Sequence, residues 1–129
     1  MSSEPDSSPS STIKVHTPDG TLFVSVVESD DESHAPRQVI LHIGKSGHSL
    51  QAWADALARV VSLALRSGLT LQSVITEVSN ISTEHRALSN GVSIRSGPEG
   101  LAHALLLYIA DKGRRIPAGD YERPSRLDG

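Results

Sequence analysis

The chain has 129 residues, a formal net charge of −3 and no cysteine. This length allows one domain, and the absence of cysteine excludes disulfides, thiolate metal sites and thiol nucleophiles. The acidic balance and the small aromatic content, one Phe, one Trp and two Tyr, argue against general binding of DNA or RNA. No apolar run is long enough to span a membrane. We therefore expect a soluble, cytoplasmic protein.

Both ends are expected to lie outside the folded body. Residues 1–11 are rich in serine and proline and nearly lack apolar side chains, which predicts a disordered tail. Residues 113–129 combine arginines and prolines with scattered apolar residues. This composition fits either a basic tail or an arm that orders against a neighbouring subunit. The folded domain is predicted to span residues 12–112.

The first half of this body predicts an antiparallel meander of three strands. Apolar and polar residues alternate along Thr12–His16, and Pro18–Gly20 is a turn sequence. The runs Thr21–Glu28 and Val39–Ile43 predict two further strands, joined by the acidic, solvated loop Ser29–Arg37. A small sheet with one apolar face needs helices to cover that face.

Helices are predicted in the second half. Ser49 is the expected N-cap of a long helix that ends at Gly68, and a short helix spans Leu71–Val78. Ser96 and Glu99 match a capping box that opens a last helix. Apolar spacing along the long helix predicts the stripe that packs on the sheet: Leu50, Trp53, Leu57, Val60, Val61, Ala64 and Leu65. The predicted fold is α+β, a small antiparallel β-meander packed against two or three helices.

A glycine-bracketed cationic turn, Gly44–Gly47, joins the third strand to the long helix. The first glycine that a P-loop requires is replaced by Val39, inside a strand, which excludes a nucleoside-triphosphatase motif. Two interpretations of the turn stay open. Its glycines serve the backbone geometry, or Lys45, Ser46 and His48 contact an anionic ligand beside the helix N-terminus.

Arginines and a polar loop supply further candidate binding residues. Arg59 and Arg66 are seven residues apart on one helix face, and they either extend from an exposed surface or bind a ligand. The predicted loop Ser79–Arg95 is long for a compact domain, which is typical of a functional or a mobile segment. Its candidate binding residues are Arg86, Asn90 and Arg95.

No catalytic or metal-binding pattern stands out. The six histidines lack metal-ligand spacing, and no serine lies in a GxSxG sequence. The carboxylates of Asp30–Glu32 are typical of a solvated loop. The sequence therefore favours a binding protein, without metal or cofactor, over an enzyme.

The segment 42–81 resembles the TSCPD-type domain found at the C-terminus of adenosylcobalamin-dependent ribonucleotide reductases. The matching features are Gly44–Gly47, Ser62–Gly68 and the pair Asn80-Ile81. A weaker match continues to Ser96–Leu101, where that family carries a Thr-Ser-Cys-Pro-Asp signature. The resemblance covers about residues 38–110.

This chain departs from the family pattern in two ways. Gly97 replaces the signature cysteine and Glu99 the aspartate, so a cysteine-dependent role is absent. The chain is also too short to hold the reductase catalytic barrel. The resemblance to the reductase domain implies that this chain is an accessory or allosteric module that docks onto a ribonucleotide reductase.

As a stand-alone domain, the chain is similar to a phage family, the Thoeris anti-defence sponges, which sequester cyclic nucleotide signals without cleaving them and assemble as oligomers. That resemblance implies a homo-oligomer in the host cytoplasm that binds a cyclic or ADP-ribose-type nucleotide. The positions that correspond to the family's ligand contacts are Arg59 on the long helix, Arg86, Asn90 and Arg95 in the loop, and Arg114 after the last helix. A third interpretation is an oligomeric structural protein without a small ligand.

Overall fold

A computed structural model of the protein describes residues 10–44 and 47–114. The first three strands are β1 (Ser10–Thr17), β2 (Gly20–Glu28) and β3 (Pro36–Gly44). They pair antiparallel in the order β1-β2-β3. The predicted α+β fold with an antiparallel meander is confirmed.

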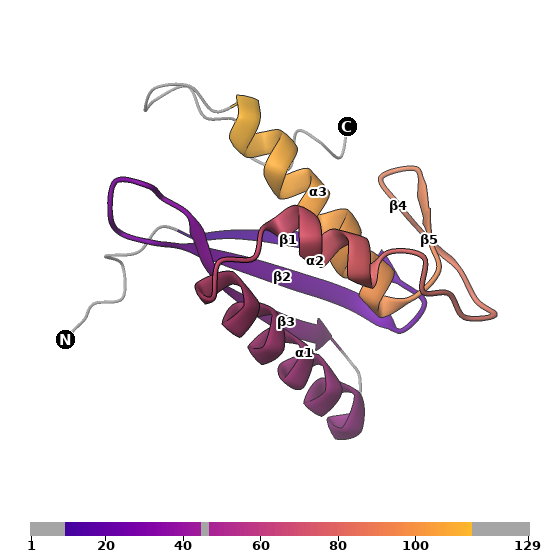
Figure 1. Ribbon diagram of the computed structural model, residues 1–129. Coiled ribbons are helices and arrows are strands. Elements are labelled where there is room, and N and C mark those ends of the chain that lie inside the picture. Colours follow the sequence, from indigo (N-terminus) through magenta and orange to yellow (C-terminus); the bar gives the residue numbers. More distant parts are fainter. Residues whose placement is uncertain (1–9, 45–46, 115–129) are drawn as a thin grey trace.

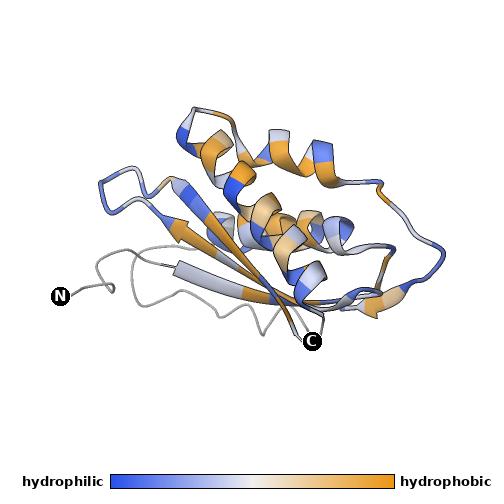
Figure 2. Ribbon diagram, turned by 90° about the horizontal axis from the view of Figure 1, so that it is seen from below, coloured by the Kyte–Doolittle hydropathy of each residue, from blue (hydrophilic) through white to orange (hydrophobic). Residues whose placement is uncertain are grey.

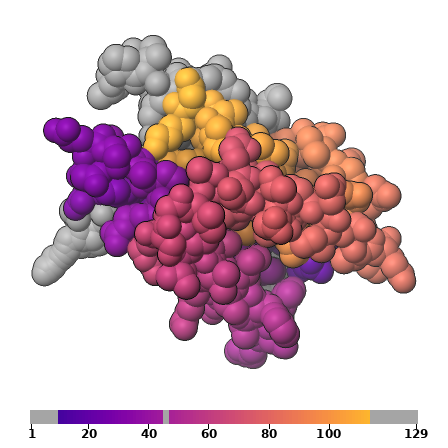
Figure 3. Space-filling view, in the orientation of Figure 1, coloured from indigo at the N-terminus to yellow at the C-terminus, as the bar shows by residue number. Residues whose placement is uncertain are grey.

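Helices cover one face of this sheet (Figure 2). α1 (His48–Arg66) packs along β3, α3 (Gly97–Arg114) packs across β1 and β2, and α2 (Leu71–Val78) packs on α3. Figure 3 shows α1 and α2 side by side on the outer surface. A hairpin of β4 (Ala87–Ser89) and β5 (Val92–Ile94) lies beside β1 (Figure 1).

The core lies between the sheet and the helices. Each strand points alternate side chains toward the helices, and these buried residues are Ile13, Val15, Leu22, Val24, Val26, Val39, Leu41 and Ile43. The side chains between them face away from the helices and are polar at most positions, as in Thr12, Lys14 and His16. The period-two pattern thus fixes which face the helices cover.

α1 also closes the outer edge of β3 by hydrogen bonding. The hydroxyl of Ser62, which is buried, accepts from Val39 N at 2.9 Å and donates to Val39 O at 3.3 Å. The side chain of Gln51 accepts from Ile43 N at 3.0 Å and donates to Leu41 O at 3.1 Å. These bonds satisfy backbone groups that an edge strand otherwise leaves unpaired.

The start of α1 differs from the prediction. The helix begins at His48, so Ser49 is already helical and the prediction of Ser49 as N-cap is wrong. Gly47 is the N-cap, with φ −72° and ψ 166°, and its carbonyl accepts from Gln51 N at 3.2 Å. Glycine has no side chain to cap the helix, so no side-chain hydrogen bond caps this end.

The end of α1 is as predicted. Gly68 adopts a φ of 102°, which glycine tolerates best. Its N–H donates to Leu65 O at 3.1 Å, and Leu69 N donates to Ala64 O at 3.0 Å. This pair of bonds is the Schellman motif. The following helix, α2, has the predicted bounds, with Thr70 as its N-cap.

The predicted loop Ser79–Arg95 contains the hairpin β4–β5, so its assignment as one loop is wrong. Asn90 and Gly91 form the turn, with φ values of 55° and 79°. Positive φ at both central residues is typical of the two-residue turns that suit hairpin twist, and Asn-Gly is their preferred sequence.

Part of the predicted core stripe on α1 is also wrong. Trp53 is 73% exposed and Val60 63% exposed. The side of α1 that reaches the core is formed instead by Val61 and Leu65 and by smaller residues, which include Ala54 and Ala58. α1 is therefore apolar on its buried side and on part of its exposed side.

The described residues extend slightly past the predicted domain limits. β1 begins at Ser10, inside the segment 1–11 predicted as a tail, and α3 continues to Arg114, inside the segment 113–129. The rest of both segments lies outside the described residues. No helix among the residues described is long and apolar enough to cross a membrane.

Candidate functional site

Arg59 and Arg66 border a groove between α1 and the outer edge of β3. The groove has a volume of about 500 Å³ and is lined by β3 residues 38–41 and by polar and small side chains of α1. Both arginines are exposed. Their separation of seven residues corresponds to about 10.5 Å along the helix axis. The predicted shared face is therefore the rim of a groove.

The charges of this groove are available to a ligand. Within residues 10–44 and 47–114, neither the Arg59 nor the Arg66 guanidinium forms an ion pair or a hydrogen bond. Asp55 lines the same groove one turn before Arg59, and its carboxylate accepts from the side-chain amide of Gln51 at 2.8 Å. The groove thus offers two cationic groups and, at one end, one carboxylate.

Arg95, another predicted binding residue, is held by its neighbours. Its guanidinium and backbone N–H donate to Glu99, with the shortest contact 2.5 Å long, and a further bond of 3.3 Å reaches Asn80 Oδ1. These hydrogen bonds from Arg95 lower the pKa of Glu99 to about 2. The same pairing raises the pKa of Arg95. Arg95 therefore joins the base of the hairpin to the start of α3.

The other predicted residues are spread over the molecule. Arg86 is exposed and its guanidinium approaches Ser93 Oγ at 3.4 Å across the hairpin, and Asn90 forms the hairpin turn. His48 is exposed at the first position of α1. Lys45 lies outside the described residues, and Arg114 is the last residue of α3.

The structure does not bring Arg59 together with the hairpin residues in one chain. α1 lies along β3, and the hairpin lies beside β1, where Ser89 Oγ accepts from His16 N at 3.0 Å. β1 and β3 are opposite edges of the sheet (Figure 1). The sequence could not show this separation, because the strand order alone decides which segments become neighbours.

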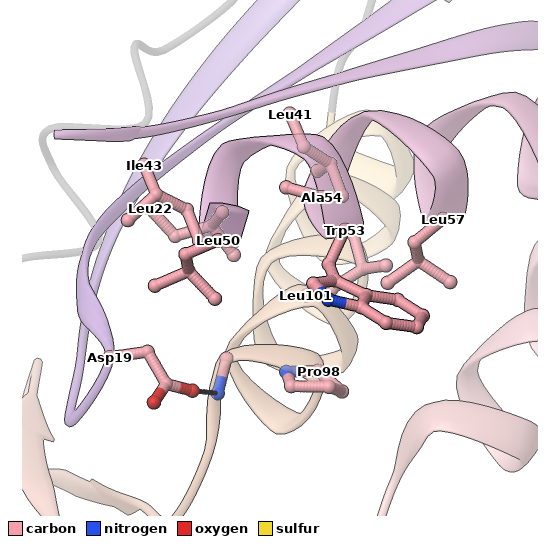
Figure 4. A pocket seen from close by; sticks show the side chains of 11 residues that line it. Asp19, Leu22, Leu41, Ile43, Leu50, Trp53, Ala54, Leu57, Pro98 and Leu101 are labelled. Carbon is pink, nitrogen blue, oxygen red and sulfur yellow. Dashed lines mark hydrogen bonds between the residues drawn. The ribbon is translucent and has the colours of Figure 1, made fainter. Parts of the chain in front are cut away.

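An apolar pocket lies between α1 and the start of α3 (Figure 4). Its volume is about 270 Å³, and most of its walls are aliphatic side chains, with Trp53 on one side. Asp19 also lines it and accepts from Gly97 N at 2.8 Å. Glu99 N donates to Ser96 Oγ at 3.0 Å. These first-turn donors of α3 are already used, so the pocket suits a compact apolar group rather than a phosphate.

A positive φ does not explain the glycines Gly44 and Gly47 in the turn before α1. A Cβ on Gly47 would meet nothing within 4 Å, and one on Gly44 would meet its nearest neighbour, Phe23, at 3.7 Å. Neither glycine has φ in the left-handed region. The interpretation that these glycines serve backbone geometry is therefore not supported at the two described positions.

The comparisons with known proteins identify the family. The model of the TSCPD domain matches residues 3–109. This chain belongs to the TSCPD domain family. The TSCPD match includes β1 and β2, which the resemblance recognised in the sequence did not cover. Searches of curated proteins and of solved structures found no significant match.

In this TSCPD domain the segment at the family signature has a structural role. Ser96 caps α3 by accepting from Glu99 N, which confirms one half of the predicted capping box. The Glu99 carboxylate accepts from Arg95 N at 2.9 Å instead of the expected Ser96 N. A Cβ on Gly97 would lie 3.0 Å from Asp19 Oδ2. The small residue at the cysteine position allows the close approach of Asp19.

Proposed function

We propose that this protein binds and sequesters a phosphate-containing nucleotide, of the cyclic or ADP-ribose type, without cleaving it. The observation that carries the proposal is that the guanidinium groups of Arg59 and Arg66, on the rim of the groove beside β3, have no ion-pair or hydrogen-bond partner among the described residues. The same proposal places the protein in the cytoplasm of a phage-infected host. The basis for this location is the resemblance to the Thoeris anti-defence sponges.

The chemistry of the groove suits such a ligand. Guanidinium groups form bidentate hydrogen bonds to phosphate oxygens and stack on flat rings. Two of them about 10.5 Å apart along the helix can contact separate phosphates of one nucleotide. Asp55, at the end of the groove, can accept hydrogen bonds from ribose hydroxyl or base amino groups.

The groove also supports binding rather than turnover. Among the side chains that line the groove, Ser62 carries a hydroxyl group. This hydroxyl is buried and is hydrogen-bonded to both the backbone N–H and the carbonyl of Val39. A nucleophile needs a free hydroxyl beside a base. Among the described residues, no cluster of three His, Asp or Glu side chains could hold a metal ion.

Family membership favours a second candidate function. The TSCPD domain is known from ribonucleotide reductases. An accessory or allosteric module of an adenosylcobalamin-dependent reductase would bind that enzyme and change its turnover. Co-purification with the reductase and an altered rate upon addition would support this candidate, and no association at micromolar concentrations would oppose it.

The test incubates the full chain with a panel of cyclic dinucleotides and cyclic ADP-ribose-type nucleotides, followed by calorimetry and by heat release with mass analysis of the released ligand. We expect one nucleotide to bind and to return unaltered. Arg59→Ala and Arg66→Ala should each weaken binding roughly 10- to 100-fold, the loss of one or two charge-assisted hydrogen bonds. Arg86→Ala, on the hairpin, is the matched control.

Three outcomes would contradict the proposal. They are a cleaved product, unchanged affinity of the Arg59 and Arg66 variants, or a loss of affinity confined to Arg86→Ala. The first would indicate an enzyme, and the last would move the site to the hairpin.

A further inference from the structure

The apolar pocket of Figure 4 is much larger than an ordinary packing defect. Its volume is about 270 Å³, whereas a folded core holds few voids larger than one water molecule. The walls come from the start of β2, the end of β3, the first half of α1 and the first turns of α3. Water inside such a cavity finds few hydrogen-bond partners, so an apolar occupant is favoured over water.

Asp19 is the charged side chain among the described residues that line this pocket. Its Oδ2 atom accepts from Gly97 N at 2.8 Å. Within residues 10–44 and 47–114, the Oδ1 atom has no hydrogen-bond or ion-pair partner. Asp19 is only partly buried, so this second oxygen remains an acceptor for a donor group of a ligand.

Trp53 borders the pocket on the side away from Asp19 (Figure 4). It is 73% exposed, the largest value among the exposed large hydrophobic side chains described. An indole ring offers a flat apolar surface on which a second aromatic ring stacks. A ligand ring that fills the pocket would cover part of the indole and remove apolar surface from water, which favours binding.

We propose that this pocket binds a small arylalkyl primary amine, with its ammonium group donating to Asp19 and its ring covered by Trp53 and the aliphatic walls. A hydrogen bond between opposite charges is roughly twice as strong as one between neutral groups, and the carboxylate disfavours an anionic ligand. The volume lies just below the range of about 300–1,000 Å³ that drug-sized ligands occupy. The amine is therefore smaller than such ligands, with about ten non-hydrogen atoms.

The amine pocket and the groove beside β3 are separate sites. Leu41 lines both, whereas Arg59 and Arg66 belong to the groove and Asp19 to the pocket. The proposal therefore does not rest on nucleotide binding. Arg59→Ala should leave the affinity for the amine unchanged, so either proposal can fail without the other.

The experiment titrates the full chain with phenethylamine, phenethyl alcohol and phenylacetate, three probes that share a phenyl ring and differ in the charge of the polar end. Calorimetry measures the affinity. Trp53 is the only tryptophan of the chain, so its emission reports binding at the pocket and should shift to shorter wavelength. We expect a Kd for the amine of about 10 μM to 1 mM. The alcohol should bind at least ~10-fold more weakly and phenylacetate more weakly still.

Matched variants assign the two ends of the ligand. Asp19→Asn keeps an acceptor for Gly97 N but removes the charge, so it should weaken amine binding at least ~10-fold and leave the alcohol unchanged. Asp30→Asn removes the same charge from the exposed loop between β2 and β3 and should change neither affinity. Ala54→Leu extends a lining side chain into the pocket and should weaken both ligands at least ~10-fold. Circular dichroism checks that each variant is folded.

Four results would overturn the proposal. They are no binding of phenethylamine up to about 10 mM, equal affinities for the amine and the alcohol, an unchanged amine affinity in Asp19→Asn, or an unchanged amine affinity in folded Ala54→Leu. The second and third would show that the carboxylate does not select the ligand, and the last would place the ligand outside this pocket.

Discussion

The Asp19 carboxylate accepts a hydrogen bond from the backbone N–H of Gly97 at 2.8 Å, across 78 residues of the chain. This bond joins the turn between β1 and β2 to the first turn of α3. It places a negative charge at the end of a helix where the backbone dipole favours it. The same carboxylate borders the apolar pocket of Figure 4.

Removing this contact should destabilise the domain. We expect Asp19→Ala to lower the free energy of unfolding by about 1–2 kcal/mol, because Gly97 N–H would lose its acceptor. Asp19→Asn keeps an acceptor and should lose only about 0.5–1 kcal/mol, the charge contribution. Urea unfolding followed by circular dichroism measures both. Equal losses for the two variants would show that the hydrogen bond itself contributes little.

A glycine within α3 should resist replacement by alanine. Alanine normally stabilises a helix interior by about 1 kcal/mol relative to glycine. At Gly100, however, a Cβ would lie 2.5 Å from Cγ2 of Thr17, so Gly100→Ala should destabilise by roughly 1–3 kcal/mol. Gly113, in the same helix, has nothing within 4 Å of such a Cβ. Gly113→Ala should be neutral or stabilising in thermal unfolding, and a stabilising Gly100→Ala would refute the packing argument.

The contact between α1 and the edge of β3 should depend on one hydroxyl. Ser62→Ala leaves Val39 N–H and C=O without their side-chain partner inside the core. The expected cost is about 1–3 kcal/mol, the penalty for an unsatisfied buried group. Ser62→Thr retains a hydroxyl and is the control. Hydrogen exchange at Val39 should accelerate in the alanine variant and change less in the threonine variant.

The Arg95–Glu99 pair should make stability depend on pH in the acid range. Hydrogen bonds from Arg95 lower the pKa of Glu99 from 4.5 to about 2. A carboxyl whose pKa is lowered by folding stabilises the native state fully above its unfolded value of 4.5, and this contribution disappears as the pH falls toward 2. Glu99→Gln should lose about 1–2 kcal/mol at pH 7 and show a shallower decline between pH 5 and pH 2. Parallel pH profiles of the two proteins would contradict this assignment.

Local signals in the sequence predicted the fold well. The Schellman end at Gly68 and the bounds of Leu71–Val78 depend on neighbouring residues alone. Alternation along the strands predicted which face is buried, because the side-chain period of a strand leaves two choices. The pair Asn90-Gly91 is a sequence signal for the hairpin. The length and polarity of the segment 79–95 favoured a single loop instead.

Placement across the chain could not be predicted. Apolar spacing on α1 does not say which apolar residues reach the sheet, so Trp53 and Val60 were assigned to the wrong side. The separation of Arg59 from Arg95 follows from strand order, which no local pattern encodes. The ion pair between Arg95 and Glu99 could be predicted only if the position of the first turn of α3 were already known.

The bonds from Ser62 and Gln51 to β3 have a consequence for association between molecules. An edge strand with free backbone groups can template the addition of further strands, which is how ordered aggregates grow. Four backbone groups along this edge, Val39 N, Val39 O, Leu41 O and Ile43 N, are engaged by side chains of the protein's own helix. Sheet-to-sheet polymerisation at this edge would first require α1 to detach. The domain can thus keep an apolar strand of high β-propensity at the edge of its sheet and resist fibril growth from that edge.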